Sequence, residues 1–142
     1  MPRPTQTPIG IVLSRTTKAV ERAFDETLAA NGSSRPVWLV LLALRAAQPS
    51  AQNGLAAEIG IREATLTHHL AAMETDGLVV RERDPANRRV QQVRMTDEGE
   101  ATFARLIGVV RAHDRRLRAG LDETEVEALR GTLGRLLANV TP

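Results

Sequence analysis

The segment Gln52–Leu70, QNGLAAEIGIREATLTHHL, is typical of two short helices joined by a tight turn. A helix-turn-helix needs a small residue where its helices touch, a residue suited to the turn, and an apolar residue that closes the core. Ala56, Gly60 and Leu66 stand at the spacing usual for these three roles. Further apolar side chains would complete the packing: Leu55, Ile59, Ile61 and Leu70.

The second of these helices carries polar residues on the side away from the predicted core. They are Thr65, Thr67 and His68, with Arg62 or His69 beside them. Threonine can bond to phosphates or contact a thymine methyl group, and the N-terminal half of such a helix can enter a DNA major groove. Small helix pairs with Ala and Gly at their contacts also occur in ordinary helical bundles, so this segment alone leaves both interpretations open.

A basic hairpin is predicted directly after these helices. Residues 78–83 and 90–95 are the only strand-like stretches, and they flank a turn-rich loop at 84–89. Five arginines in residues 81–94 stand against Glu82 and Asp84, which gives a local charge of +3. The arginines are Arg81, Arg83, Arg88, Arg89 and Arg94. Two strands with a basic loop after a recognition helix describe a wing, which lies against the DNA backbone and can insert Arg into a narrow minor groove. The alternative for Arg88 and Arg89 is a solvated turn.

Helices are predicted on both sides of this unit. Apolar residues recur at helical spacing from Ile9 to a stop at Asn31-Gly32. A second helix is expected from residue 37 to Gln48, and its residues 37–44 are apolar on all sides, which indicates a buried central helix. Ser50 is expected to cap the short helix that ends near Ile59, and Gly77 to end the helix of residues 62–75. Thr96 and Asp122 are expected to cap the last two helices. The final helix has a one-sided apolar stripe: Val126, Leu129, Leu133, Leu136, Leu137 and Val140.

The expected fold is mainly α with one small β-hairpin, a winged helix-turn-helix with flanking N- and C-terminal helices. Residues 1–8 carry three prolines and are expected to form a flexible tail. Residues 37–96 form the predicted DNA-binding domain, and residues 9–36 and 97–142 the predicted dimerisation helices. The terminal helices carry apolar stripes that so small a domain could cover only in part, which suggests that they pack between the two chains of a homodimer. The alternative is that these helices fold back on their own chain.

Composition excludes several classes of function. The 142 residues suffice for one core. The absence of Cys removes disulfides, thiolate zinc sites, iron–sulfur clusters and thiol redox sensing. One Trp and two Phe, with no Tyr, cannot build the stacking platforms of most single-strand binders. The apolar run 37–44 is too short to span a bilayer, and no signal peptide is recognisable, so we expect a cytoplasmic protein with no membrane partner.

The chain resembles the MarR family of transcriptional regulators over nearly its whole length. The resemblance is carried by LAAEIGI at 55–61, TLTHHL at 65–70, METDGLVVRERD at 73–84 and NRRVQQVRMTDEG at 87–99. It implies an obligate winged-helix homodimer that binds double-stranded DNA at a pseudo-palindromic operator, usually as a repressor. It also implies that the first and last helices form the dimer interface, in agreement with their apolar stripes.

The resemblance assigns roles to individual residues. Thr65, Thr67 and His68 stand at recognition-helix contact positions, with Arg62 near the start of that helix. Arg88 or Arg89 stands at the position of the wing arginine that enters the minor groove, and Asp84 at that of an acid that often holds an Arg. Three residues depart from the family pattern. His68 stands where the family often has Arg, and Asn87 stands where the wing usually has Asp. Arg62 stands near the helix cap, where the family often has Asp.

The resemblance further implies a small aromatic or lipophilic effector bound between the dimer helices and the winged domain. Arg15, Trp38 and His113 could reach such a cavity, although Trp38 is better explained as core and the other two as solvated or ion-paired. We expect no metal, because the adjacent His68 and His69 point to different sides of a helix, and no cofactor. No catalytic constellation or phosphate-binding loop is recognisable, so the chain is not predicted to be an enzyme. The main alternative is a dimeric helical interaction module that has lost specific DNA binding.

Overall fold

The structure, a computed structural model, describes residues 6–142 and divides into two units, residues 1–109 and 110–142. Most of the expected tail, residues 1–5, lies outside the described residues, and Gln6 and Thr7 precede Pro8, the N-cap of the first helix. The elements of the first unit are α1 (Ile9–Ala30), α2 (Arg35–Ala46), β1 (Ser50–Ala51), α3 (Gln52–Ile59), α4 (Glu63–Thr75), β2 (Val79–Arg83) and β3 (Gln91–Met95), followed by the first part of α5 (Asp97–Leu117). α6 (Glu123–Val140) belongs to the second unit.

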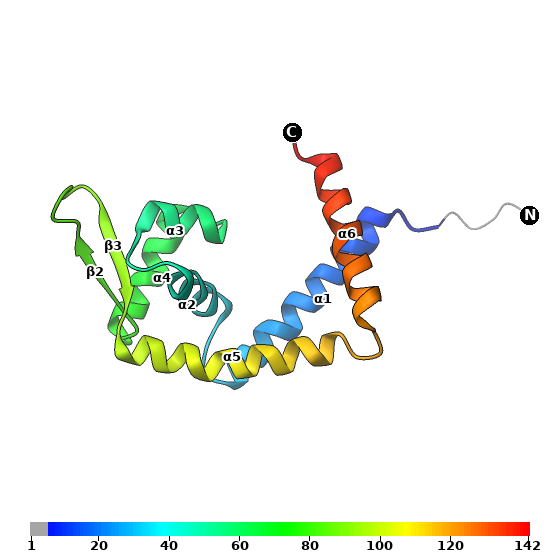
Figure 1. The fold of residues 1–142 in the computed structure, drawn as a ribbon, viewed down its shortest axis with the longest axis horizontal. Helices are drawn as coiled ribbons and strands as arrows, with labels where there is room; N and C mark the ends of the chain where they lie inside the picture. Colours follow the sequence, from blue (N-terminus) through cyan, green and yellow to red (C-terminus); the bar gives the residue numbers. More distant parts are fainter. Residues whose placement is uncertain (1–5) are drawn as a thin grey trace, which may run out of the picture. The chain divides into compact units, whose positions relative to one another are not determined.

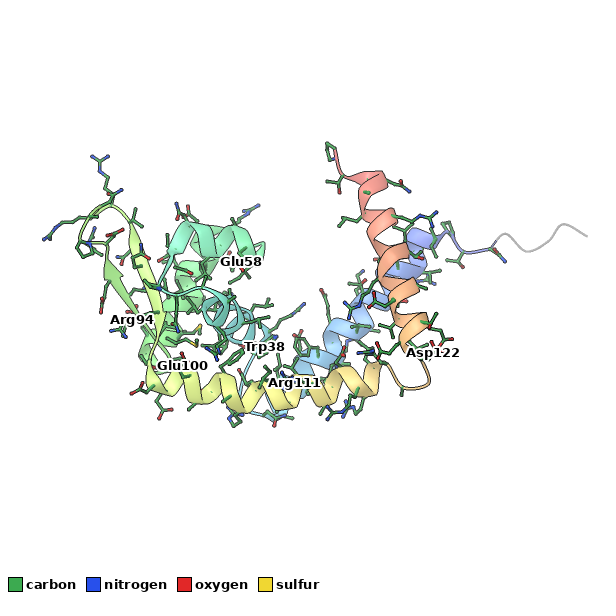
Figure 2. The ribbon with its side chains drawn as sticks, in the orientation of Figure 1. Trp38, Glu58, Arg94, Glu100, Arg111 and Asp122 are labelled. Carbon is green, nitrogen blue, oxygen red and sulfur yellow. The ribbon has the colours of Figure 1, made fainter. Side chains whose placement is uncertain are left out.

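The core of the first unit is built from the apolar faces of α2, α3, α4 and the sheet. Leu41, Leu55, Leu66 and Val93 are each at most 1% exposed. α2 is central but is not buried on all sides as expected: Trp38, Val40, Leu41, Ala43 and Leu44 are buried, whereas Leu42 is 43% exposed. Trp38, labelled in Figure 2, is a core residue: its ring stacks on Phe103 of α5, with centroids 5.6 Å apart and the planes 1° from parallel.

The sheet has three strands rather than the expected two. β2 and β3 form the predicted hairpin, which stands beside the helices in Figure 1, and β1 pairs antiparallel with the other edge of β3. The expectation that Ser50 caps α3 is therefore wrong: Ser50 pairs with Val93, its hydroxyl donates to the carbonyl of Ala47, and Ala51 occupies the N-cap without a side-chain bond. Pairing with β3 satisfies the backbone of Ser50 and overrides the local capping preference.

A compact joint fixes the base of the hairpin to the start of α5. The end of α4 reverses at Gly77, which has φ +75° as predicted, and the N–H of Leu78 bonds to the carbonyl of Met73 at 2.9 Å. Thr96 caps α5 as predicted: its Oγ1 accepts from the N–H of Gly99 at 3.0 Å and donates to the carbonyl of Gly77 at 2.5 Å. Hydrogen bonds at Leu78 and Thr96 therefore hold the two ends of the hairpin to α4 and α5.

The second unit contains the end of α5 and all of α6. Asp122 caps α6 as predicted, in a reciprocal capping box with Glu125 in which both hydrogen bonds measure 2.8 Å. Arg118 bridges Asp114 and Glu123 across the turn, at 3.4 and 2.5 Å. His113 and Val126 are buried, whereas Leu129, Leu133, Leu137 and Val140 of the α6 stripe are exposed. In residues 6–142 no helix is long and apolar enough to cross a membrane.

Candidate nucleic-acid interface

The predicted helix-turn-helix is present as α3, a tight turn, and α4. The turn residue Gly60 has φ +81°, a conformation that glycine adopts without steric penalty. The N–H groups of Gly60 and Ile61 both bond to the carbonyl of Ala56, at 2.9 and 3.1 Å, so the turn satisfies the end of α3. Ala56 and Leu66 are almost completely buried at the contact between the two helices, in the roles assigned to them from their spacing.

The predicted contact residues of α4 lie on its exposed side. Arg62 is the N-cap, and Thr65, Thr67 and His68 are exposed, while Leu66 is fully buried between them. His69 is only half-exposed and its ring is tilted 60° from that of His68, at a centroid distance of 6.0 Å. Burial of Leu66 thus orients the polar residues on either side of it toward solvent.

One of these residues, Thr67, is held by a network that the sequence did not indicate. Its hydroxyl donates to the carbonyl of Glu63 at 2.9 Å and accepts from Nε2 of Gln52 at 2.6 Å. Because the single hydroxyl proton points to Glu63, the amide of Gln52 must present its nitrogen to Thr67 and its oxygen elsewhere. Gln52, the first residue of α3, therefore fixes the position of Thr67 on the neighbouring helix.

The wing loop is tied by bonds to its own backbone. The N–H of Asp84 bonds to the carbonyl of Val90 at 2.9 Å, and the carboxylate of Asp84 accepts from the N–H of Ala86 at 2.9 Å and from Gln92 at 3.3 Å. Asn87, in place of the family's acid, accepts from the N–H of Arg89 at 3.2 Å. Within residues 6–142 Asp84 forms no ion pair with an arginine, so it supports the loop through backbone and amide bonds instead.

The five hairpin arginines differ in whether a carboxylate pairs with their guanidinium group. Arg81 pairs with Glu74 of α4 at 2.6 Å and Arg94, on the outer side of β3 in Figure 2, pairs with Glu82 at 3.3 Å. Arg83 donates to the carbonyl of Arg88 at 2.8 Å. Arg88 and Arg89 are exposed, and in the described part of the chain neither forms an ion pair. Among the described hairpin residues, Arg83, Arg88 and Arg89 are therefore the arginines that no carboxylate pairs, and Arg88 and Arg89 lie in the loop at the tip of the wing.

A cavity of about 240 Å³ lies between the helix-turn-helix and the wing. Gln52 and Glu63 line it on the helical side, and Arg89 and Gln91 on the wing side. The Oε1 atoms of Gln52 and Gln91 are both buried without a hydrogen-bond partner. Neither glutamine was predicted as a site residue from the sequence, because nothing in the local pattern of either one shows that the start of α3 and the start of β3 meet here.

Replacing Gln52 by leucine is expected to weaken DNA binding without unfolding the protein. Loss of the bond to Thr67 removes about 1 kcal/mol of positioning free energy, which corresponds to roughly a fivefold loss of affinity. Fluorescence anisotropy with a bound duplex measures this change. Glu58→Ala is the control, since Glu58 is exposed at the other end of α3 (Figure 2). Equal affinities of the two variants would contradict the role assigned to Gln52.

The three residues predicted to contact an effector do not line one cavity within either unit. Trp38 is part of the core, and Arg15 is exposed on α1. His113 is 9% exposed and lies in the second unit, where it has an interaction partner. An effector role for them stays a prediction.

Comparison with known proteins identifies the family. The MarR family model matches residues 34–90, which contain the helix-turn-helix and the start of the wing. A solved structure of the transcriptional repressor CouR, bound to a 23-mer DNA duplex, is 31% identical with a TM-score of 0.85 and matches over 92% of each chain. The chain belongs to the MarR family.

Other MarR-type structures agree with this assignment. A MarR-family transcriptional regulator from Rhodococcus sp. RHA1 is 29% identical with a TM-score of 0.81, over 93% of this chain and 96% of that one. A probable transcriptional regulator from Pseudomonas aeruginosa is 27% identical with a TM-score of 0.83, over 94% and 99%. The predicted fold class is confirmed: this MarR-family protein is a transcriptional regulator with a DNA-binding winged helix-turn-helix.

Proposed function

We propose that this MarR-family protein acts as a homodimeric repressor that binds a pseudo-palindromic operator in double-stranded DNA. α4 would enter the major groove with Thr65, Thr67 and His68, and the wing would place Arg88 or Arg89 in the adjacent minor groove. The observation that carries the proposal is that Arg88 and Arg89, which form no ion pair among the described residues, lie at the tip of a wing that follows an exposed recognition helix. A relative described as a repressor bound to a DNA duplex supports it.

A homodimer is supported by the apolar side chains that each unit leaves exposed. On α1 these are Ile9, Ile11, Val12 and Leu13, and on α6 they are Leu129, Leu133, Leu137 and Val140. Exposed apolar side chains gathered on one helix are typical of protein–protein interfaces. A two-fold dimer would present two recognition helices to half-sites about one helical turn of DNA apart. Residues 9–36 and 97–142 are accordingly proposed as the dimerisation segments, and residues 37–96 as the DNA-binding domain.

Selection from a pool of random duplexes tests the proposal directly. The expected result is enrichment of an inverted repeat with half-site centres about 10 base pairs apart, retained in the presence of excess nonspecific competitor. The same operator should appear among genomic fragments that the protein retains, and transcription from an adjacent promoter should rise when the gene is deleted. Binding without sequence preference, or no binding, would favour the helical interaction module instead and overturn the proposal.

The two wing arginines are expected to contribute through phosphate and minor-groove contacts. Arg88→Ala and Arg89→Ala should each reduce operator affinity and lower the slope of log K against log salt by about 0.9 for each lost phosphate contact. Salt titrations of the selected duplex measure both quantities. Arg22→Ala, which removes an exposed arginine from α1, should leave the slope unchanged. Slopes that match the wild type in both wing variants would remove the wing from the interface.

A further inference from the structure

The two exposed threonines of the recognition helix differ in how their hydroxyl groups are bonded. Thr65 lies in the first turn of α4 and Thr67 in the second. A threonine hydroxyl carries one proton and two lone pairs, so its hydrogen bonds can be counted. Bonding to a phosphate oxygen requires that proton, whereas contact with a thymine methyl group requires only the threonine methyl. The bonds that each hydroxyl already makes within the protein therefore distinguish the two kinds of contact.

The hydroxyl of Thr67 is bonded on both sides within the protein. It donates its proton to the carbonyl of Glu63, one turn earlier in α4, at 2.9 Å. The same oxygen accepts from Nε2 of Gln52 in α3 at 2.6 Å. Turning the proton toward DNA would break the bond to Glu63. These two bonds, made to different helices, fix the χ1 angle of Thr67, and they leave its Cγ2 methyl as the end of the exposed side chain that can meet a partner.

The hydroxyl of Thr65 is not bonded in this way, because of its place at the start of the helix. A threonine inside a helix donates to the carbonyl four residues earlier. For Thr65 that carbonyl belongs to Ile61, which precedes the N-cap Arg62 and lies outside α4. Within residues 6–142 the side chain of Thr65 forms no hydrogen bond. Its proton is therefore available to a DNA acceptor without the loss of any bond in the protein.

We propose that Thr67 is a specificity-determining residue that recognises one thymine of each half-site through its methyl group, whereas Thr65 binds DNA through its hydroxyl. This inference rests on the proposed operator binding and adds the chemistry of two of its contacts. Burial of one methyl group against another changes affinity about fourfold. The oxygen of Thr67 keeps one lone pair, so the rival contact is acceptance of a hydrogen bond from a base amino group. That rival contact does not depend on the thymine methyl.

Deoxyuridine in place of single thymines of the selected operator tests the methyl contact, because uracil lacks only the C5 methyl group of thymine. Each thymine of one half-site, on either strand, is replaced in turn, and fluorescence anisotropy with the full-length protein measures the affinity. The expected result is a position at which the wild-type protein binds the uracil duplex about fourfold more weakly than the thymine duplex. The ratio of these two affinities is the quantity that the variants must change or preserve.

Two substitutions of Thr67 separate its methyl group from its hydroxyl. Thr67→Ser keeps the hydroxyl and removes the methyl, so it should bind the thymine and uracil duplexes equally well. Thr67→Val keeps a methyl and removes the hydroxyl, so it should preserve the wild-type ratio. Loss of the bond to Gln52 or of stability lowers the affinity for both duplexes alike and leaves the ratio unchanged. A Thr67→Ser variant that preserves the ratio, or a Thr67→Val variant that loses it, would overturn the proposed methyl contact.

The same two substitutions at Thr65 are the matched control, with the opposite expectation. Thr65→Val should bind both duplexes about fivefold more weakly, through loss of one hydrogen bond, and Thr65→Ser should bind them as the wild type does. A Thr65→Val variant with wild-type affinity would overturn the role of the Thr65 hydroxyl. A selected operator in which no thymine shows the loss with uracil overturns the methyl contact while the proposed function stands. Absence of any selected operator overturns the proposed function, and this inference with it.

Discussion

Gly99→Ala is expected to destabilise the protein by about 2–4 kcal/mol, a lowering of Tm by roughly 5–15 °C. A Cβ atom at position 99 would lie 2.2 Å from the carbonyl oxygen of Leu78 and 3.2 Å from Cβ of Met95. The carbonyl group of Leu78 cannot easily move away, because both ends of this residue are hydrogen-bonded. Its oxygen accepts a hydrogen bond from the N–H of Thr96 at 3.0 Å, and its N–H donates to the carbonyl of Met73 in α4. The added methyl group must therefore break the joint between α4, the hairpin and α5.

Urea or thermal denaturation followed by circular dichroism measures this effect, and Gly108→Ala is the matched control on the same helix. Gly108 is exposed in α5, and a methyl group added there would meet no neighbouring atom within 4 Å. Alanine at this position should therefore raise stability by about 0.5–1 kcal/mol through helix propensity. If Gly99→Ala and Gly108→Ala had similar Tm values, the close approach of α5 to Leu78 would not be a rigid contact.

Leu133→Glu is expected to convert the proposed homodimer to a monomer and to reduce operator affinity by more than about 100-fold. Leu133 lies in the exposed apolar stripe of α6 and is 39% exposed in the single chain. An uncompensated carboxylate buried in an interface costs about 3–5 kcal/mol, which is at least two orders of magnitude in association. α6 itself should persist, because Glu is a good helix former and the capping box at Asp122 is untouched.

Sedimentation equilibrium measures the mass against the 15.5 kDa of one chain, and anisotropy measures operator binding. Ala138→Glu introduces the same charge on the opposite side of α6 and should leave both the mass and the affinity unchanged. A Leu133→Glu variant that sediments as a dimer would assign the interface to other surfaces. A monomeric variant with full operator affinity would separate dimerisation from DNA binding.

Much of the fold and part of the interface were predictable because their signals are local. Gly77 ends a helix because glycine adopts positive φ, and Thr96 and Asp122 cap helices because their side-chain oxygens reach the nearby N–H groups. The helix-turn-helix core and the exposed residues of α4 follow from helical periodicity alone. The basic wing follows from its turn residues and the arginines between its strands.

The features that the sequence left open all depend on residues distant in the chain. Ser50 is a good cap by type but forms a strand, because Val93 offers it a sheet edge. The hydrogen bond from Gln52 to Thr67 joins residues fifteen positions apart, and the sequence around neither residue predicts it. Arg35 of α2 pairs with Glu21 and Asp25 of α1, each at 3.0 Å, and these ion pairs form only when α1 and α2 pack against each other.

The sequence by itself determined a winged helix-turn-helix, the exposed face of its recognition helix, and the arginines of its wing, because periodicity, capping and turn chemistry act between near neighbours. Only the tertiary structure decided which of those arginines keep their charge free, since Glu74 and Glu82 neutralise Arg81 and Arg94 across elements. It also decided that Gly99 leaves no room for a side chain. Such contacts arise from packing, which no single segment of the chain encodes.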